Sequence, residues 1–521
     1  MTATEEKVVE KTEKRERPEP TDQISITRHR LKIGKREIAY TATCGTVVLR
    51  EETEKEGKHE GDKARAKVFF IAYTLDDPGL KTTGAGSADK AARPVTFSFN
   101  GGPGSSSVWL HLGVLGPRRV ALDDEGRAPQ PPGRLVDNEF TLLDESDLVF
   151  IDPVGTGYSR MVEGENLKEY REYKRDLESV GEFIRLWTTR YGRWASPKYL
   201  IGESYGTTRA SGLSLYLLQR YGMYLNGVML VSVALDFQVL RFDHANDLPP
   251  VVFLPTYAAT AWYHKRLAPD LQKKPLRRLL DEVEAFAATE YAEALFQGAK
   301  LAPKERKTVV AKLARYTGLA PEYIERTDLR IEIFRFCKEL MRDEHRTVGR
   351  LDSRFTGRDR DAAGEEFEFD PAMVEIFGAY AAAMNDYVRT TLRFEADLPY
   401  EVIKAFYADW GWKDYANRFA SVGAELRQAI SMNPRMRVFV ANGYFDLATP
   451  HFGSDYTVAH LGLAPELRDN VSVTYYEAGH MMYAHRPSLK KLAAELRQFV
   501  HGERGHQTRD VSGRQGPRKR V

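Results

Sequence analysis

The sequence predicts an α/β protein with a mostly parallel central sheet and an inserted, mainly helical region. Several strand candidates are continuous apolar runs, such as Val228–Val231 and Val438–Ala441, and runs of this kind fit strands that are covered on both faces. A helical pattern over 170–187 joins two strand candidates, as a parallel crossover requires. Between about 240 and 420 the series of strands is interrupted by helical patterns. These three observations together indicate the fold class.

The strand candidates follow one another along the chain, and helices separate several of them. They lie at 30–50, 67–76, 94–99, 147–152, 198–202, 227–233, 436–442 and 471–476, with the charged stretch 51–64 as a hairpin-like connection. The helix that precedes the strand at 198–202 has an apolar stripe at steps of three and four, on Tyr170, Tyr173, Leu177, Val180, Ile184 and Trp187. It ends near Gly192, because Ser196-Pro197 prevents its continuation. A second helical pattern follows Ser204, with Leu213 and Leu217 on one face.

These elements divide the chain into five expected segments. A charged disordered tail covers 1–22, the α/β core covers 23–240 and 421–501, a helical cap is inserted at 241–420, and a basic disordered tail covers 502–521. Such a cap would lie over the carboxyl ends of the strands, where open α/β sheets bind their ligands. The charged stretch 342–369 within the cap is interpreted as a solvated loop, with a place in the cleft as the alternative.

Composition excludes several classes of function. The chain has 521 residues, 42% of them hydrophobic, a net charge of +2 and a mean hydropathy of −0.46, which predicts a soluble globular protein without an electrostatic preference for nucleic acid or membranes. Cys44 and Cys337 are the only cysteines, so neither a disulfide framework nor a thiolate metal site is expected.

Localisation is predicted from what the sequence lacks. The first 20 residues have no apolar core of a secretory signal, and no uninterrupted apolar stretch of 18 residues is present. We therefore expect a cytoplasmic protein, or a periplasmic or secreted one if the true start or a signal is missing. The sequence does not decide whether the chain forms a homo-oligomer.

The most informative motif is Gly202-Glu-Ser-Tyr-Gly206, which follows the apolar run Tyr199-Leu-Ile201 and precedes a helical pattern. The pattern G-x-S-x-G is typical of a sharp strand-to-helix turn that presents a serine nucleophile above a sheet. Ser204 would lie at the helix N-terminus, where backbone N–H groups favour developing negative charge.

Further segments supply the partners that a serine nucleophile needs. Asn100-Gly-Gly-Pro-Gly-Ser-Ser106 follows a strand candidate and can place N–H groups beside the nucleophile as half of an oxyanion hole. Asp446 and His480 each follow a later strand candidate, and the order Ser204, Asp446, His480 is that of α/β-hydrolases. The alternatives are Asp455 for the acid, and His451 and His485 for the base. Asp152 precedes Ser204, which is the wrong order for a catalytic acid, and is interpreted as a turn residue beside Pro153.

Five motifs together resemble the serine carboxypeptidase family, within the α/β-hydrolase superfamily, and they occur in the family's order. They are Asn100–Ser106, Ile151–Ser159, Gly202–Gly206, Asn442–Asp446 and Gly479–Met481. The resemblance, over roughly 30–500, implies that Ser204 is the nucleophile, Asp446 the orienting acid and His480 the general base. It also implies that Gly101 and Tyr205 provide the oxyanion N–H groups, and that Asn100 and Glu203 recognise the carboxylate at the substrate's C-terminus.

The chain departs from the family pattern at positions that serve substrate recognition. Ser98 stands where the family usually has a Trp, and Val114 where it has the Glu that completes a carboxyl cluster. Ser105 replaces the usual Cys of the glycine loop, so the family's disulfide there is absent, and Tyr444 stands where an Asp often precedes the catalytic one. Arg160 and Arg209 are candidates to replace the missing carboxylate recognition, although surface positions or salt bridges are favoured for both.

We therefore predict a serine-type carboxypeptidase with a Ser-His-Asp acyl-enzyme mechanism and peptides as substrate. No metal or cofactor is needed for this chemistry. An esterase or acyltransferase with the same triad is the first alternative, favoured by Ser98 and Val114. A non-catalytic binding protein on a hydrolase scaffold is the second.

Overall fold

A ten-stranded sheet forms the centre of the molecule. The structure is a computed structural model that describes residues 19–76 and 91–502. The strands are, in spatial order, β1 (Gln23–Ile33), β2 (Arg36–Lys55), β3 (Lys58–Asp76), β7 (Asp147–Ile151), β4 (Val95–Phe99), β9 (Lys198–Ser204), β10 (Gly227–Val233), β13 (Arg437–Gly443) and β14 (Val471–Tyr476), with β8 (Arg160–Met161) beside β3. The strands from β7 to β14 are parallel, and β1, β2 and β3 are antiparallel. The carboxyl ends of the parallel strands therefore meet at one edge.

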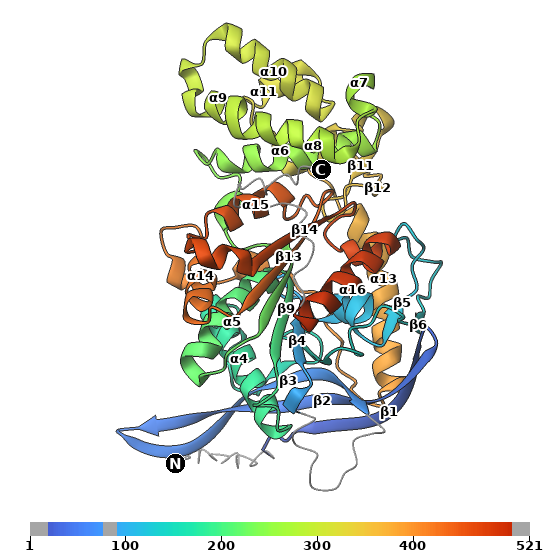
Figure 1. Ribbon diagram of the computed structural model, residues 1–521, viewed down its shortest axis with the longest axis vertical. Coiled ribbons are helices and arrows are strands. Elements are labelled where there is room, and N and C mark those ends of the chain that lie inside the picture. Colours follow the sequence, from blue (N-terminus) through green and yellow to red (C-terminus); the bar gives the residue numbers. More distant parts are fainter. Residues whose placement is uncertain (1–18, 77–90, 503–521) are drawn as a thin grey trace, which may run out of the picture.

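Helices cover both faces of the parallel strands (Figure 1). One face is covered by α4 (Tyr173–Arg190), α5 (Tyr205–Tyr221) and α14 (Gly423–Met432), and the other by α13 (Pro371–Asp386), α16 (Arg486–His501) and the short α2 (Val108–Leu110). Each face has its own apolar core, and alternate residues of a strand enter opposite cores: Leu200 enters the first and Ile201 the second. This alternation is why these strands are apolar throughout rather than on one face.

A helical lobe and a connecting segment are inserted between β10 and β13. The helices of the lobe are α6 (Leu248–Tyr263), α7 (Pro269–Gln272), α8 (Leu276–Phe286), α9 (Ala292–Gln297), α10 (Pro303–Thr317), α11 (Pro321–Arg326) and α12 (Ile333–Glu339). Two further helices lie outside the insertion: α3 (Leu167–Tyr170) precedes β9, and α15 (His451–Ala459) follows β13. Helices α6 to α12 share an apolar core that includes Phe253, Leu279 and Leu313, and α6, α8, α9, α10 and α11 lie beyond α15 and β14 in Figure 1. Two small hairpins, β5 (Arg118–Val120) with β6 (Leu135–Asp137) and β11 (Thr347–Val348) with β12 (Thr356–Gly357), lie outside the central sheet.

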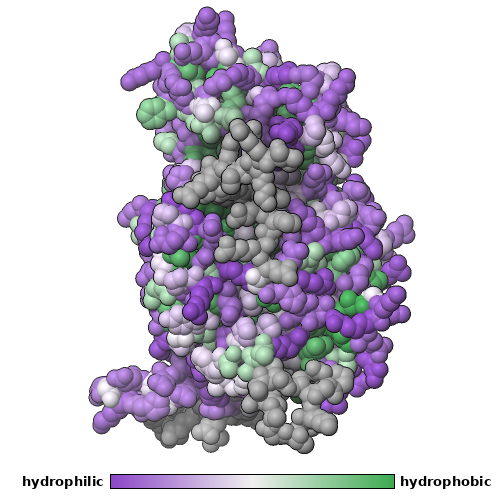
Figure 2. Space-filling model, in the orientation of Figure 1, coloured by the Kyte–Doolittle hydropathy of each residue, from purple (hydrophilic) through white to green (hydrophobic). Residues whose placement is uncertain are grey.

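The surface is mainly hydrophilic on the face shown in Figure 2, with scattered apolar patches. In the described residues, no helix combines the length and the apolar character that crossing a membrane would require. Cys44 and Cys337 are both buried as free thiols.

The predicted α/β-hydrolase fold, with a mostly parallel sheet flanked by helices, is confirmed, and two details of the elements differ from expectation. Strands β2 and β3 continue through the charged stretch predicted as a connection, and they turn only at Glu56 and Gly57, which both have positive φ. Polar side chains do not prevent a strand here, because this end of the hairpin is exposed and pairs only with itself. The edge strand β1 begins at Gln23, earlier than the expected 30.

The two predicted tails lie mostly outside the described residues. Within the described part, Asp22 forms an ion pair with Arg190 (2.6 Å) and accepts a hydrogen bond from the Val48 N–H (2.8 Å). Residues 19–22, which the prediction included in the N-terminal tail, are therefore placed against the sheet. At the other end, Gly502 closes α16 in a left-handed conformation.

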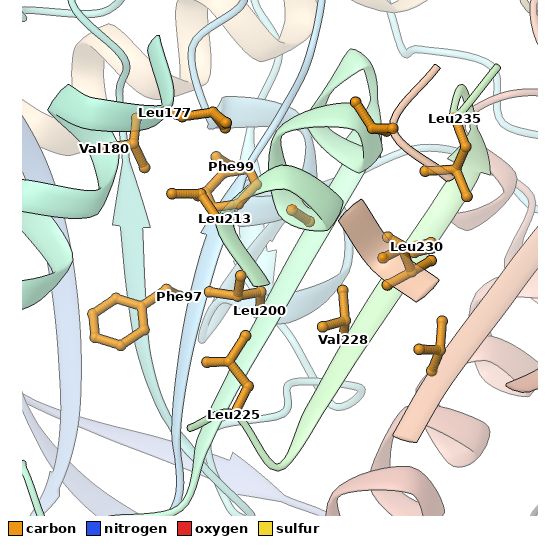
Figure 3. Close-up of a cluster of buried hydrophobic side chains, with 14 of the residues drawn as sticks. Phe97, Phe99, Leu177, Val180, Leu200, Leu213, Leu225, Val228, Leu230 and Leu235 are labelled. Carbon is orange, nitrogen blue, oxygen red and sulfur yellow. The ribbon is translucent and has the colours of Figure 1, made fainter. Parts of the chain in front are cut away.

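Replacement of Leu213 by Ala tests the core between the sheet and α4. Leu213 is fully buried in the cluster that contains Phe99, Leu177 and Leu200 (Figure 3). We expect Leu213→Ala to lower the free energy of unfolding by about 2–5 kcal/mol, because the lost side chain leaves a cavity that the packed neighbours only partly fill. Urea denaturation followed by circular dichroism measures the change. The matched control is Leu398→Ala, whose side chain is 52% exposed, and equal destabilisation by both variants would contradict this account.

Candidate active site

Ser204 lies at the end of β9, immediately before α5, and its backbone has φ of 60° and ψ of −129°. A residue other than glycine rarely adopts such a conformation, and strain of this kind is typical of functional turns. The turn closes only because the residues two positions before and after Ser204 are glycines. A Cβ at Gly202 would overlap the Gly206 carbonyl, and one at Gly206 would lie 2.8 Å from the Phe99 carbonyl oxygen. The motif therefore forms the predicted elbow, with the partly exposed Ser204 at its tip.

Asp446 and His480 come together from the loops that follow β13 and β14. The Nδ1 atom of His480 lies 2.7 Å from Oδ2 of Asp446. The aspartate is fully buried; its Oδ1 accepts hydrogen bonds from the N–H groups of Ala448 (2.7 Å) and Thr449 (2.9 Å), and the Thr449 hydroxyl donates to Oδ2 (2.6 Å). These contacts fix the carboxylate so that it orients the imidazole, which is the role of the acid in a catalytic triad.

The elbow and the histidine loop are joined through β10. The Ser232 hydroxyl donates to the carbonyl oxygen of His480 (2.6 Å), and the neighbouring Val233 pairs with Ser204. Within the described part of the chain, the Ser204 hydroxyl makes no hydrogen bond to His480. In enzymes without substrate this bond is often long, and it shortens when the substrate binds.

The glycine loop after β4 lies directly against the elbow. A Cβ at Gly101 would overlap the main-chain nitrogen of Tyr205 and would lie 2.7 Å from the Glu203 carbonyl oxygen. Outside the regular elements, neither the Gly101 N–H nor the Tyr205 N–H donates a hydrogen bond to a described residue. The Gly101 loop therefore lies against the start of α5, where we expect an oxyanion hole to draw its donors.

Asn100 and Glu203 form a buried polar pair beside Ser204. The Asn100 amide nitrogen donates to Glu203 Oε1 (2.9 Å), and Asn100 Oδ1 accepts from the Leu110 N–H (3.1 Å). Burial raises the pKa of Glu203 to about 7, although His480, Tyr483 and Asn100 act in the opposite direction. At acid pH Glu203 is therefore a neutral carboxyl group that can donate a hydrogen bond.

The pKa of His480 reflects the same electrostatics. Burial lowers the pKa of the imidazole, but the carboxylates of Asp446 and then Glu203 outweigh burial, so the pKa lies above its usual 6.5. The imidazolium that forms when His480 accepts a proton is therefore stabilised, as a general base requires.

The two arginines considered for carboxylate recognition hold the protein itself together. Arg209 is buried; it forms an ion pair with Asp176 of α4 (2.8 Å) and donates to the Asn100 carbonyl oxygen (2.7 Å). Arg160 donates to the carbonyl oxygens of Gly157 and Ser159 (both 2.9 Å). The salt-bridged interpretation therefore describes both arginines, since Arg160 also lies 4.0 Å from Glu401 and donates to the Pro399 carbonyl oxygen (2.7 Å).

The alternative acid and bases are engaged elsewhere. The Tyr475 hydroxyl donates to Asp455 (2.5 Å), His451 contacts Glu284 (3.2 Å) and His485 contacts the Ser488 hydroxyl (2.8 Å). Asp152 is buried and accepts a hydrogen bond from the Ser107 N–H (2.8 Å). The substituted positions Ser98 and Val114 are both buried.

The interpretation of 342–369 as a solvated loop is wrong for its central residues. Leu351 accepts a hydrogen bond from the His480 N–H (2.6 Å), and Asp352 accepts one from the Gly479 N–H (3.0 Å). Asp352 and Arg354 are buried and paired with each other (2.7 Å). Charged residues suggested exposure, but here opposite charges compensate each other at short range, and no sequence signal indicated that they face the histidine loop.

Within the described residues, no group of three or more His, Cys, Asp or Glu side chains is arranged to hold a metal ion.

Comparisons with known proteins support the resemblance over part of the chain. The family model "Serine carboxypeptidase" matches residues 76–236. A pheromone-processing carboxypeptidase KEX1 of Saccharomyces cerevisiae is 34% identical over 139 residues, which are 26% of this chain and 16% of that protein. Serine carboxypeptidase-like 29 of Arabidopsis thaliana is 30% identical over 120 residues, 22% of this chain and 23% of that protein. The chain thus matches less than a quarter of the length of either relative. Among solved structures, the crystal structure of VinJ covers 87% of this chain at 13% identity and a TM-score of 0.34.

The pH dependence of activity is expected to change when Glu203 loses its charge. Because the Glu203 carboxylate raises the pKa of His480, Glu203→Gln should lower that pKa and move the acid limb of kcat/KM to lower pH. Hydrolysis of an activated ester between pH 5 and 9 measures the limb, whose apparent pKa belongs to the coupled pair. The exposed Glu477→Gln is the control, and an acid limb that stays in place or rises in Glu203→Gln would contradict the electrostatic link.

Gly101→Ala tests the oxyanion donors. The added Cβ would overlap the main-chain nitrogen of Tyr205 and force the glycine loop away from the elbow. We expect kcat for an activated ester to fall about 10²–10³-fold, the usual effect of losing one oxyanion donor. Gly378→Ala is the matched control, because a Cβ there meets no atom within 4 Å. Unchanged kcat in a folded Gly101→Ala protein would remove Gly101 from the oxyanion hole.

Proposed function

We propose, from the premise that this chain is a serine hydrolase of the serine carboxypeptidase family, that it releases C-terminal amino acids from peptides. The premise rests on the family match over residues 76–236 and on the fold. The observation that carries the proposal is the juxtaposition of two features at the ends of the neighbouring strands β4 and β9: the nucleophile Ser204, and the buried Asn100–Glu203 pair beside it.

In the proposed mechanism, the Ser204 oxygen attacks the carbonyl carbon of the last peptide bond while His480 accepts the hydroxyl proton. Asp446 keeps the imidazole oriented, and the N–H groups of Gly101 and Tyr205 donate to the oxyanion. The tetrahedral intermediate collapses, the C–N bond breaks, and His480 gives its proton to the departing amine. Water then attacks the acyl-enzyme by the same route, which restores Ser204 and releases the shortened peptide as an acid.

Recognition of the substrate's terminal carboxylate is assigned to Asn100 and Glu203. An ionised Glu203 would repel that carboxylate, whereas a protonated one can donate a hydrogen bond to it. The pKa of about 7 for Glu203 supports the neutral form at acid pH. We therefore infer that affinity for peptides with a free C-terminus increases as the pH falls below 7.

Ser98 and Val114 favour a second candidate, an esterase or acyltransferase that uses the same triad. Val114 is buried and apolar, so it offers no second carboxyl group to share a proton with Glu203. With one carboxyl group instead of two, discrimination between a free C-terminus and an ester can be weaker. The triad chemistry is the same in both candidates.

The test compares a blocked dipeptide with a free C-terminus and its C-terminally amidated twin from pH 4 to 8. We expect release of the terminal amino acid from the free acid, with a KM that falls toward the acid end and a kcat that falls there as His480 is protonated, and little cleavage of the amide. Ser204→Ala should abolish the release. If neither peptide is cleaved and an activated ester is, the esterase or acyltransferase candidate replaces the carboxypeptidase.

A further inference from the structure

The loop Gly349–Phe355, which joins β11 and β12, lies against both loops that carry the acid and the base of the site. It belongs to the inserted region between β10 and β13. On the histidine side, the carbonyl oxygen of Leu351 accepts a hydrogen bond from the N–H of His480 itself (2.6 Å). Oδ2 of Asp352 accepts one from the N–H of the preceding Gly479 (3.0 Å). Two consecutive N–H groups of the histidine loop are therefore held by this inserted loop.

The same loop holds both neighbours of the catalytic acid. The Ser353 N–H donates to the Phe445 carbonyl oxygen (3.0 Å), and the Leu447 N–H donates to the Arg350 carbonyl oxygen (3.0 Å). Asp446 lies between these two residues. The four consecutive residues 350–353 thus make hydrogen bonds with His480 itself, with the residue before it and with both neighbours of Asp446.

Asp352 fits the histidine loop closely. A Cβ at Gly479 would overlap the Asp352 side chain and would lie 2.5 Å from its Cα, so the approach requires glycine at 479. Oδ1 of Asp352 accepts hydrogen bonds from the Arg354 N–H (3.1 Å) and Nε (3.0 Å), and the other oxygen accepts from Arg354 as well as from Gly479. Asp352 is buried, and its partners fix the orientation of its carboxylate.

The loop is itself anchored on two helices of the inserted region. Asp370, the N-cap of α13, accepts hydrogen bonds from the N–H groups of Arg350 (3.2 Å) and Leu351 (2.9 Å). On α6, the Thr260 and Ser353 hydroxyls share a hydrogen bond of 2.6 Å, and His264 bonds the Ser353 carbonyl oxygen (2.7 Å). Movement of α6 or α13 would therefore reach the histidine loop through hydrogen bonds.

We propose that Asp352 is a positioning residue for the base His480, and that the loop Gly349–Phe355 couples the inserted region to the triad. Asp352 acts through the Gly479 backbone and makes no contact with substrate in this role. The inference rests on the proposed function, because it takes His480 as the general base. A small displacement of a catalytic group is sufficient for a large loss of rate, since an error of about 1 Å can cost about 10²-fold.

The experiment measures kcat and KM of Asp352→Ala for an activated ester, beside Glu125→Ala as matched control. Glu125 is an exposed carboxylate 4.0 Å from Arg354, so its loss disturbs the same arginine without removing the bond to Gly479. We expect kcat to fall about 10–10²-fold in Asp352→Ala with KM little changed, and Glu125→Ala to match the native protein. Asp352→Asn keeps the size and one acceptor oxygen, so it should recover part of the lost kcat and decides the question if the alanine variant does not fold.

Two controls separate this inference from the proposed function. Ser204→Ala and His480→Ala should both abolish hydrolysis, and if they do not, the proposed triad fails. If both abolish it and a folded Asp352→Ala protein keeps native kcat, or Asp352→Asn recovers none of the kcat that Asp352→Ala loses, only the positioning role of Asp352 is overturned. A rise in KM without a fall in kcat, or an equal fall in Glu125→Ala, would also overturn it, because a displaced base lowers the rate of the chemical step.

Discussion

The close approach of two glycine turns, at the ends of β4 and β9, is the constraint on which the rest of the site depends. Gly101 lies where any side chain would overlap the Tyr205 nitrogen, and Gly202 and Gly206 face each other across the elbow. Because no Cβ intervenes, the glycine loop lies directly against the first residues of α5, and the Asn100–Glu203 pair lies beside Ser204. Arg209 holds the glycine loop in place, since it donates to the Asn100 carbonyl oxygen and forms an ion pair with Asp176 of α4.

The acid and base side of the site depends on parts of the chain that are far apart. Asp446 and His480 follow neighbouring strands, but their loops are also held by an inserted hairpin that is anchored on α6 and α13. The inserted region thus supports the loops that carry Asp446 and His480. In α/β folds, variation in such loops changes the chemistry while the sheet stays the same.

The elements that were predictable are those with a local signal. Apolar runs gave the parallel strands within one or two residues, and the glycines around Ser204 identified the elbow. Partners distant in the chain could not be found this way: Asp352 and Gly479 are 127 positions apart, and a charged stretch favours an exposed loop unless its compensating charges are known. For the same reason the sequence did not indicate that Arg209 is buried against Asp176. The polar end of the β2–β3 hairpin was missed for another reason, because it lacks the apolar alternation that identifies a half-buried strand.

The most direct test of the central claim, that Ser204 is an activated nucleophile, is covalent labelling. The native protein is treated with an active-site-directed fluorophosphonate, and the modified peptide is identified by mass spectrometry. The account predicts one adduct per chain, on Ser204, because only a serine with a base and oxyanion donors reacts readily with such a reagent. No adduct, or an adduct on another serine, would contradict it.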